Sequence, residues 1–336
     1  MTGRERVLAL LDGRAVDHLP LMPITMMFAA DQIGAKYGTY ALDHRVLVDA
    51  QIRTAENFAL DHVSGITESR EAPDCGAAVR YFEDQPFAMD EQNARLASKA
   101  SLAQLKMPDP ANAEHMQDRL RGLALLKDRV GRERLVEGWL EGACGAAADL
   151  RGINTLMLDF YDDAAFVRDL FEFVVELGIR FGRAQVEAGA ELIGVGDAPA
   201  SLVGPAIYRE FVWPYDKKLV DGLHAAGARV RMHICGSTNR ILEDIGRLGC
   251  DIVDIDSAVP LSLAREKMGP GQVLLGNLDP VRDVRNGSPE SIAAALAECH
   301  RQAGPRYIVA AGCEVPRDTP PENLKAMASY ASSHQP

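Results

Sequence analysis

ARVRMHICGSTNRILEDIGRLGCDIVDID, residues 228–256, contains a complete strand–helix–strand unit. Residues 228–236 form a short apolar run that ends at a glycine, and residues 251–256 form a second run. Between them, residues 239–249 repeat apolar side chains with the helical period and end at Gly249. Two strands joined in this way by a helix lie parallel, with a right-handed crossover. The stretch therefore predicts one unit of a parallel sheet.

The same alternation extends outward and predicts eight strands. Besides the two runs above, strand-like segments occupy residues 19–26, 60–66, 134–142, 191–198, 272–279 and 307–316. Helical periodicity occurs in residues 4–13, 261–269 and 289–304. Eight strands that alternate with helices favour a closed barrel over an open sheet. We therefore predict an α/β protein that folds as a single (β/α)8 TIM barrel domain over residues 1–336.

One segment interrupts the regular alternation. VRYFEDQPFAMDEQ, residues 79–92, predicts a small β-hairpin, so we expect an insertion over residues 75–93 after the second strand. No Ser/Gly-rich linker divides the chain, and 336 residues lie within the range of one barrel with insertions. One domain with a small hairpin insertion is the simplest organisation.

The composition argues against several classes of function. A formal net charge of −12 disfavours nucleic acid and anionic membranes as partners. No apolar run approaches the roughly 20 residues that span a bilayer, and the charged N-terminal sequence does not resemble a signal peptide. Six cysteines are too few for a disulfide scaffold in a chain of this length. We expect a cytoplasmic protein whose cysteines are reduced.

Polar side chains follow the predicted strands where each strand ends, which is the end at which barrel enzymes carry their active sites. A single acid there is equally well explained by the general polarity of strand ends. The residues at these ends are Glu141, Asp197, His233 with Cys235, Asp254 with Asp256, Asn277 with Asp279, and Cys313 with Glu314.

His233 and Cys235 lie two residues apart on one predicted strand. Side chains alternate along a strand, so both are expected to face the barrel interior at its rim. A histidine and a thiolate are half of a zinc site, and Cys313 at the end of the last strand could be the third ligand. Such a set would leave one position open, as in catalytic zinc sites. The spacing alone also fits a buried histidine beside an inert cysteine.

Several stretches together resemble the uroporphyrinogen decarboxylase superfamily, and within it the zinc-dependent methyltransferases that work with a corrinoid. The most specific part is the His-x-Cys of residues 233–235 together with Cys313. The resemblance covers nearly the whole chain, and it implies Zn²⁺ bound by His233, Cys235 and Cys313. It also implies cobalamin carried by a separate corrinoid protein. The similar stretches are RERVLALLDGRAVDHLPLMP, VEGWLEGACG, EAGAELIGVGDAPASLVGPAIYREFVWPYDKKLV, MHICGSTNRILEDIGRLGCDIVDID, LLGNLDP and IVAAGCEVPRDTPPENLKAM.

The sequence departs from the decarboxylase branch just after the first strand. That branch carries an arginine-bearing motif there for the carboxylates of its porphyrin, whereas this chain reads MMFAADQ over residues 26–32. An acidic rim without those cations would repel a substrate with many carboxylates. Metal-free decarboxylation is therefore the alternative function, and a barrel that only binds a partner is a third hypothesis.

Two directions of methyl transfer remain open. Zinc could activate a thiol acceptor such as coenzyme M, or it could polarise a methylated donor, as in O-demethylation, while cobalt(I) attacks the methyl group. The sulfonate of coenzyme M would need a cation, for which Arg317 is a candidate. Met26, Met27 and Phe28 would suit an apolar or aromatic donor, although such residues are also common in cores. They favour the donor-side enzyme.

This chemistry suggests roles for the other polar residues at the predicted strand ends. We expect Glu141, Asp197 and Glu314 nearest the metal, as an exchangeable fourth ligand or a proton acceptor. Asp256 and Asn277 could orient the substrate, or hold His233 in its ligating tautomer by a hydrogen bond.

Overall fold

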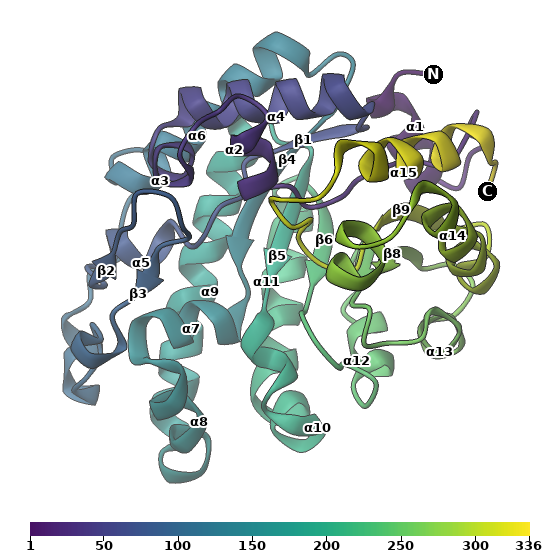
Figure 1. The fold of residues 1–336 in the computed structure, drawn as a ribbon. Coiled ribbons are helices and arrows are strands. Elements are labelled where there is room, and N and C mark those ends of the chain that lie inside the picture. The colour runs from purple at the N-terminus through teal and green to yellow at the C-terminus, as the bar shows by residue number, and fades with distance from the viewer.

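The computed structural model describes residues 1–336. A parallel sheet of seven strands lies in the middle of the molecule, and helices surround it (Figure 1). The sheet order is β1-β4-β5-β6-β7-β8-β9, so each strand of the sheet pairs with the next in the chain. This order and the curl of the sheet are those of a TIM-like barrel. The strands are β1 (His62–Ser64), β4 (Leu135–Glu141), β5 (Leu192–Gly196), β6 (Arg229–His233), β7 (Ile252–Ile255), β8 (Val273–Leu278) and β9 (Tyr307–Ala311).

Helices precede the sheet, connect its strands and close the chain. They are α1 (Gly3–Leu11), α2 (Met27–Asp31), α3 (Tyr37–Leu42), α4 (His44–Phe58), α5 (Glu71–Asp74), α6 (Glu114–Val130), α7 (Ala143–Arg151), α8 (Ile153–Asp162), α9 (Ala164–Glu187), α10 (Gly204–Ile207), α11 (Trp213–Ala225), α12 (Leu242–Gly246), α13 (Leu261–Met268), α14 (Pro289–Ala303) and α15 (Pro321–Ser333). No helix combines the length and the apolar character that crossing a bilayer requires.

Residues 19–26 do not form the regular first strand that we predicted. Within this segment, only Leu21 forms a bridge, parallel to Val309 of β9. Pro20 and Pro23 lack the N–H groups that a continuous ladder needs, which explains why the pairing stops. The prediction of eight regular strands is therefore wrong, and the sheet has seven.

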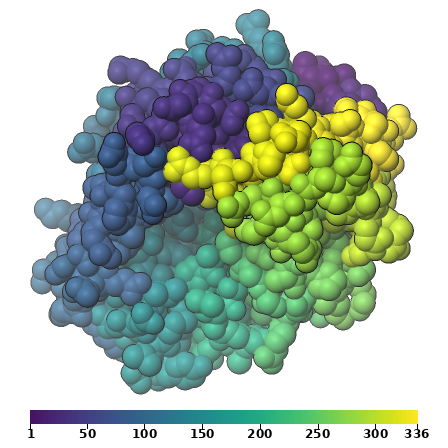
Figure 2. Space-filling model, viewed as in Figure 1, coloured from purple at the N-terminus to yellow at the C-terminus, as the bar shows by residue number.

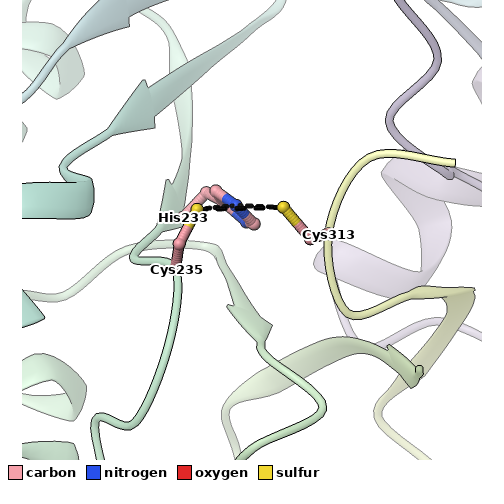
Figure 3. A group of neighbouring side chains, drawn as sticks. All are labelled: His233, Cys235 and Cys313. Atoms are coloured by element: carbon pink, nitrogen blue, oxygen red, sulfur yellow. Dashed lines mark hydrogen bonds between the residues drawn. The ribbon is translucent and has the colours of Figure 1, made fainter. Parts of the chain in front are cut away.

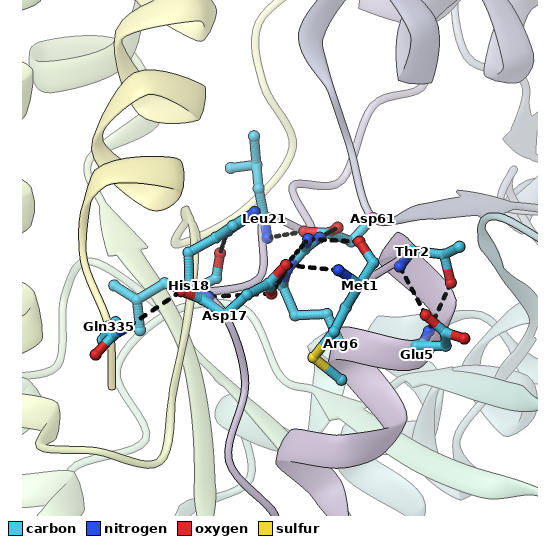
Figure 4. Close-up of polar contacts among 10 residues, drawn as sticks. Met1, Thr2, Glu5, Arg6, Asp17, His18, Leu21, Asp61 and Gln335 are labelled. Carbon is cyan, nitrogen blue, oxygen red and sulfur yellow. Dashed lines mark hydrogen bonds and ion pairs between the residues drawn. The ribbon is translucent and has the colours of Figure 1, made fainter.

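A polar network nevertheless holds this segment against β1 (Figure 4). The Asp61 N–H donates to the Leu21 oxygen at 3.0 Å, and the Leu21 N–H donates to the Asp61 carboxylate at 2.7 Å. Arg6 of α1 forms ion pairs with both Asp61 and Asp17. Leu21 is thus bonded to Asp61, next to β1, while its neighbours Pro20 and Met22 exchange hydrogen bonds with Val309 of β9.

The predicted strands are also shorter than expected. β6 ends at His233 and β9 ends at Ala311, so Cys235 and Cys313 each lie two residues beyond a strand. The helix expected over residues 239–249 is reduced to α12, whereas α13 and α14 end next to Gly269 and Gly304 as predicted. The two proposed thiol ligands therefore lie on loops at the ends of the strands.

The segment after β1 contains two short strands. β2 (Val79–Arg80) and β3 (Ala88–Met89) pair antiparallel, with two residues from each strand. Figure 1 shows this pair beside α5, away from the main sheet. That residues 75–93 are an insertion added to a barrel stays a prediction.

The apolar core leaves one end of the sheet free for polar residues. Eleven buried apolar residues from α1, the segment around Met22 and the strands form one cluster, which includes Leu135, Leu192 and Ile252 where their strands begin. The two ends of the chain meet, because the Leu19 N–H donates to the His334 oxygen at 2.8 Å. Figure 2 shows the yellow C-terminal segment against purple N-terminal residues on the surface. Apolar packing thus covers the beginnings of the strands, and the polar residues lie at their ends.

Candidate metal centre

The three predicted ligands meet where β6 and β9 end (Figure 3). His233 Nε2 lies 3.1 Å from the Cys235 sulfur and 3.7 Å from the Cys313 sulfur. The two sulfurs are 3.8 Å apart, and the histidine is buried while the cysteines are half-buried. All three ligand atoms lie within 4.8 Å of one another, so together they could hold a metal ion.

The separations suit a tetrahedral ion. Zinc bonds of ~2.3 Å to sulfur and ~2.0 Å to nitrogen, at tetrahedral angles, place two sulfurs ~3.8 Å apart and a nitrogen ~3.5 Å from a sulfur. The sulfur–sulfur distance matches this value, and the two nitrogen–sulfur distances lie on either side of it. Two thiolates and a neutral imidazole are also a preferred zinc donor set. The residues therefore fit a zinc ion with one position left for another ligand.

Two glycines shape the loops that carry the thiols. Gly236 has a φ of +84°, a conformation that favours glycine, and it turns the chain directly after Cys235. Its N–H donates to Asp256 at 2.8 Å, which fixes this turn to the loop after β7. Gly312, just before Cys313, allows close approach of the same loop, because a Cβ atom there would lie 2.5 Å from the Ser257 nitrogen. Asp256 thus positions a ligand loop through the backbone.

His233 is oriented by a buried chain of charges. Its Nδ1 lies 3.0 Å from Asp254, the residue opposite it on β7, which leaves Nε2 for a metal ion. Arg231 bonds to Asp254 at 2.8 Å and to Glu137 at 3.0 Å. We predicted this role for Asp256 or Asn277. The register of β6 and β7, which the sequence does not contain, gives it to Asp254.

The charge states of the ligands reflect their contacts. Burial by itself would lower the pKa of His233. Its hydrogen bonds to Asp254 and Cys313 outweigh burial, and the pKa is raised to about 9. The hydrogen bond from Cys235 lowers the pKa of Cys313 to about 4, and the same bond raises the pKa of Cys235. These shifts make Cys313 the more acidic of the two thiols and His233 more basic than a free imidazole, and a bound cation would displace the protons of its ligands.

Comparison with known proteins identifies the family. The family described as uroporphyrinogen decarboxylase (URO-D) matches residues 2–334. The chain belongs to the URO-D family. Among curated relatives of this family member, the methylcobamide:CoM methyltransferase MtbA of Methanosarcina mazei is 26% identical over 99% of the chain and 98% of the relative. The methylcobamide:CoM methyltransferase MtaA of Methanosarcina barkeri is 24% identical, over 98% of the chain and 97% of the relative.

A solved structure supports the same overall fold for this URO-D family member. A methyltransferase from Methanosarcina mazei superposes with a TM-score of 0.90, over 99% of both chains, at 21% identity. At this level of identity the likeness shows the fold alone. The α/β architecture with a curled parallel sheet is therefore shared over the whole chain.

The predicted catalytic acids of the URO-D family member take different positions around the centre. Asp197 is buried and accepts hydrogen bonds from the N–H groups of Cys144 and Gly145, at the start of α7. Burial raises the pKa of Asp197 to about 7, and burial with the Asp149 carboxyl raises the pKa of Glu141 well above its usual range. Asp197 therefore caps a helix, and the catalytic roles of both acids stay predictions.

Glu314 contacts the segment that carries Met26, Met27 and Phe28, the three apolar residues predicted to bind the substrate. Glu314 accepts a hydrogen bond from the Met27 N–H at 3.0 Å, and burial raises the pKa of Glu314 to about 7. Met26 and Met27 are partly exposed, whereas Phe28 is buried and its ring packs 5.4 Å from that of Phe58. Phe28 is thus a core residue. Of the three residues predicted to line an apolar donor pocket, only Met26 and Met27 remain partly exposed.

Two further predicted residues are occupied by other contacts. The Asn277 amide donates to the backbone oxygens of Asp256 and Val259, at 3.1 and 2.7 Å. Arg317, the predicted partner of a sulfonate, pairs instead with Asp31 and Asp84. Asn277 therefore holds the loop after β7, and Arg317 is already neutralised by two carboxylates.

Asp254→Asn is expected to weaken metal binding by about 10- to 100-fold, as loss of such supporting bonds does elsewhere. The amide cannot match the charge that holds the His233 ring, although its size is nearly unchanged. Competition with a chromophoric chelator measures the affinity of the purified variant. Asp251→Asn is the matched control, because Asp251 lies just before the same strand and pairs with Arg229 and His224 instead. Equal metal affinity in Asp254→Asn and the native protein would contradict the positioning role.

Proposed function

We propose that the protein is a zinc-dependent methyltransferase that moves a methyl group from the cobalamin of a separate corrinoid protein to a small thiol such as coenzyme M. The observation that carries the proposal is the convergence of His233, Cys235 and Cys313, with distances that suit zinc. Support also comes from relatives that are named methylcobamide:CoM methyltransferases and match nearly the whole chain.

The thiol-acceptor direction replaces the donor direction that the sequence favoured. The relatives' names support methyl transfer to a thiol, and Phe28 belongs to the core. Metal-free decarboxylation is the weaker alternative. A uroporphyrinogen decarboxylase of Streptomyces avermitilis is 27% identical, but over only 70% of the chain. A thiolate pair beside a histidine also has no evident use in that reaction.

The chain's own residues would prepare the thiol. His233, Cys235 and Cys313 would hold the ion, and Asp254, which lies 3.0 Å from Nδ1 of His233, would keep Nε2 of that ring available to it. When bound, zinc lowers the pKa of a coordinated thiol from about 8.5, so that a thiolate is present at neutral pH. Glu314, next to Cys313 in the chain, has a pKa of about 7 and can take the proton that the thiol releases. The thiol sulfur would then be free to take the methyl group of the corrinoid substrate, with a new sulfur–carbon bond replacing the cobalt–carbon bond, whose electrons would stay on cobalt.

Two finer structural expectations belong to the same proposal. A single closed barrel over residues 1–336 is supported by residues 20–22, because Leu21 bonds to Asp61 beside β1 while Pro20 and Met22 bond to Val309 of β9. A closed barrel would place the ligand loops on one rim, where a corrinoid protein could approach them. Location in the cytoplasm stays a prediction.

The function is tested with the purified protein, methylcobalamin and 2-mercaptoethanesulfonate. We expect about one zinc ion per chain, and conversion of methyl-cobalt(III) to cobalt(I), followed by its absorbance. The reverse arm offers a cobalt(I) corrinoid with methoxylated compounds, and activity only there would reverse the direction of transfer. Full activity in metal-free protein, or no methyl transfer in either arm, would refute the proposal.

A further inference from the structure

A small apolar cluster lies beside the metal centre, apart from the main core. Ile24, Ile66 and Trp139 form this cluster, and they are 6%, 4% and 8% exposed. Partly exposed Met26 packs against them. Neither the main core nor the cluster where the strands begin includes these residues. Small satellite clusters are common in proteins, so the place of this one decides what it does.

Strand alternation places Trp139 in the same layer as the metal-binding histidine. Leu135, Glu137 and Trp139 lie two residues apart along β4, so their side chains share one face. Leu135 belongs to the apolar cluster where the strands begin, and Glu137 pairs with Arg231 in the next layer. His233 follows Arg231 by two residues, as Trp139 follows Glu137. The two rings are therefore neighbours in the last layer, with centroids 6.4 Å apart.

Glycines of β5 provide the space that the indole ring occupies. Gly194 is the register partner of Trp139, and a Cβ atom on this glycine would overlap the ring. A Cβ atom on Gly196 would lie 3.2 Å from the indole nitrogen. From the layer below, the Arg231 guanidinium carbon lies 5.8 Å from the ring centroid. Close packing against these residues gives the ring a defined position beside His233.

The edge of the indole that carries its nitrogen is open to a ligand. The backbone of Trp139 is fully bonded to the Gln185 side chain, at 2.8 Å through its N–H and at 3.0 Å through its oxygen. The ring N–H, by contrast, has no partner in the protein, and it is not among the polar atoms that the fold seals from solvent. A buried indole N–H usually finds a partner. Trp139 therefore offers both an apolar face and a free donor next to the metal centre.

We propose that Trp139 contacts the substrate thiol and limits the length of its carbon chain. The chain packs on an apolar floor formed by Trp139, Ile24 and Ile66. The inference rests on the proposed function for the identity of the substrate as a thiol. Because the indole and the His233 ring are neighbours, the carbon chain of a thiol bound at the metal centre lies against this floor. A large ring in a fixed position admits a short chain and excludes a longer one, because overlap in a packed site is costly.

The first test compares ethanethiol and butanethiol as methyl acceptors, with methylcobalamin as the donor. We expect the native protein to prefer ethanethiol. Trp139→Ala should shift the ratio of the two kcat/KM values roughly 10- to 100-fold towards butanethiol, as extra room for methylene groups does in other pockets. A purely structural role of Trp139 would lower both values equally and leave their ratio unchanged.

Matched variants accompany this comparison. Trp213→Phe is the control, because Trp213 is the second tryptophan of the chain and donates its ring N–H to the Asp244 oxygen at 2.7 Å. It should keep the native ratio. Trp139→Phe retains a smaller aromatic ring, so it should shift the ratio in the same direction by a smaller factor. This variant decides the matter if Trp139→Ala does not fold.

The second test needs no turnover. In Trp213→Phe the only tryptophan is Trp139, so the emission of this protein reports on one position. Adding ethanethiol to the zinc-loaded protein should change this emission and reach saturation. The same addition should produce no saturable change after Cys313→Ser is introduced, because the thiol then lacks its metal ion.

The outcomes distinguish this inference from the proposed function. A ratio in a folded Trp139 variant that is unchanged, or that moves towards ethanethiol, overturns the size limit. Methyl transfer to thiols without a saturable change in Trp139 emission overturns the contact. Absence of methyl transfer together with a saturable change in emission overturns the proposed function and leaves Trp139 as a residue that contacts the bound thiol.

Discussion

Cys313→Ser is expected to purify without its metal ion and without methyl transfer. Binding of zinc to four-ligand sites is worth about 10–16 kcal/mol, so one lost ligand costs about 3–4 kcal/mol, or roughly 100- to 1,000-fold in affinity. A serine hydroxyl is a poor substitute, because it does not ionise at neutral pH. Metal content by mass spectrometry and methylcobalamin turnover with 2-mercaptoethanesulfonate measure both effects.

The control for this variant is Cys250→Ala. Cys250 is buried before the start of β7, at the opposite end of the strand from the metal centre. It should retain the native metal content, with at most a small loss of stability. A Cys313→Ser protein that holds zinc as tightly as the native protein would remove Cys313 from the ligand set.

Arg231→Met is expected to lower the free energy of unfolding by about 3–5 kcal/mol, the usual cost of breaking a buried ion pair from one side. Arg231 is fully buried and bonds to both Glu137 and Asp254, so its loss leaves two buried carboxylates without their cation. Asp254 would then hold His233 less firmly, and metal affinity should also fall. Urea unfolding of the metal-free protein measures the stability.

Arg229→Met isolates the effect of burial on the same strand. Arg229 pairs with Asp12 and Asp251 at the surface, where such pairs contribute about 0–1 kcal/mol. The decrease in the free energy of unfolding of Arg229→Met should therefore be small, and it should depend on the salt concentration. If Arg231→Met and Arg229→Met lowered the free energy of unfolding equally, the buried ion pairs of Arg231 would stabilise the protein no more than surface pairs do.

The alternation of apolar strands with helices predicted the fold class and most of the strand order. It failed at residues 19–26, because an apolar pattern reports which side chains prefer burial and not whether the backbone can pair. Pro20 and Pro23 lack donors, so this segment reaches β9 through one bridge at Leu21. The sequence contained that information, since prolines are incompatible with a regular central strand.

The sequence by itself predicted the proposed ligands, because His233, Cys235 and Cys313 are residue types that bind zinc and each lies near the end of a predicted strand. Only the tertiary structure decided which groups form hydrogen bonds to these three residues and orient them. Strand register places Asp254 against His233, where the sequence suggested Asp256 or Asn277. Local spacing specifies chemistry within one strand, whereas contacts between strands and the partners of buried charges exist only after the chain has folded.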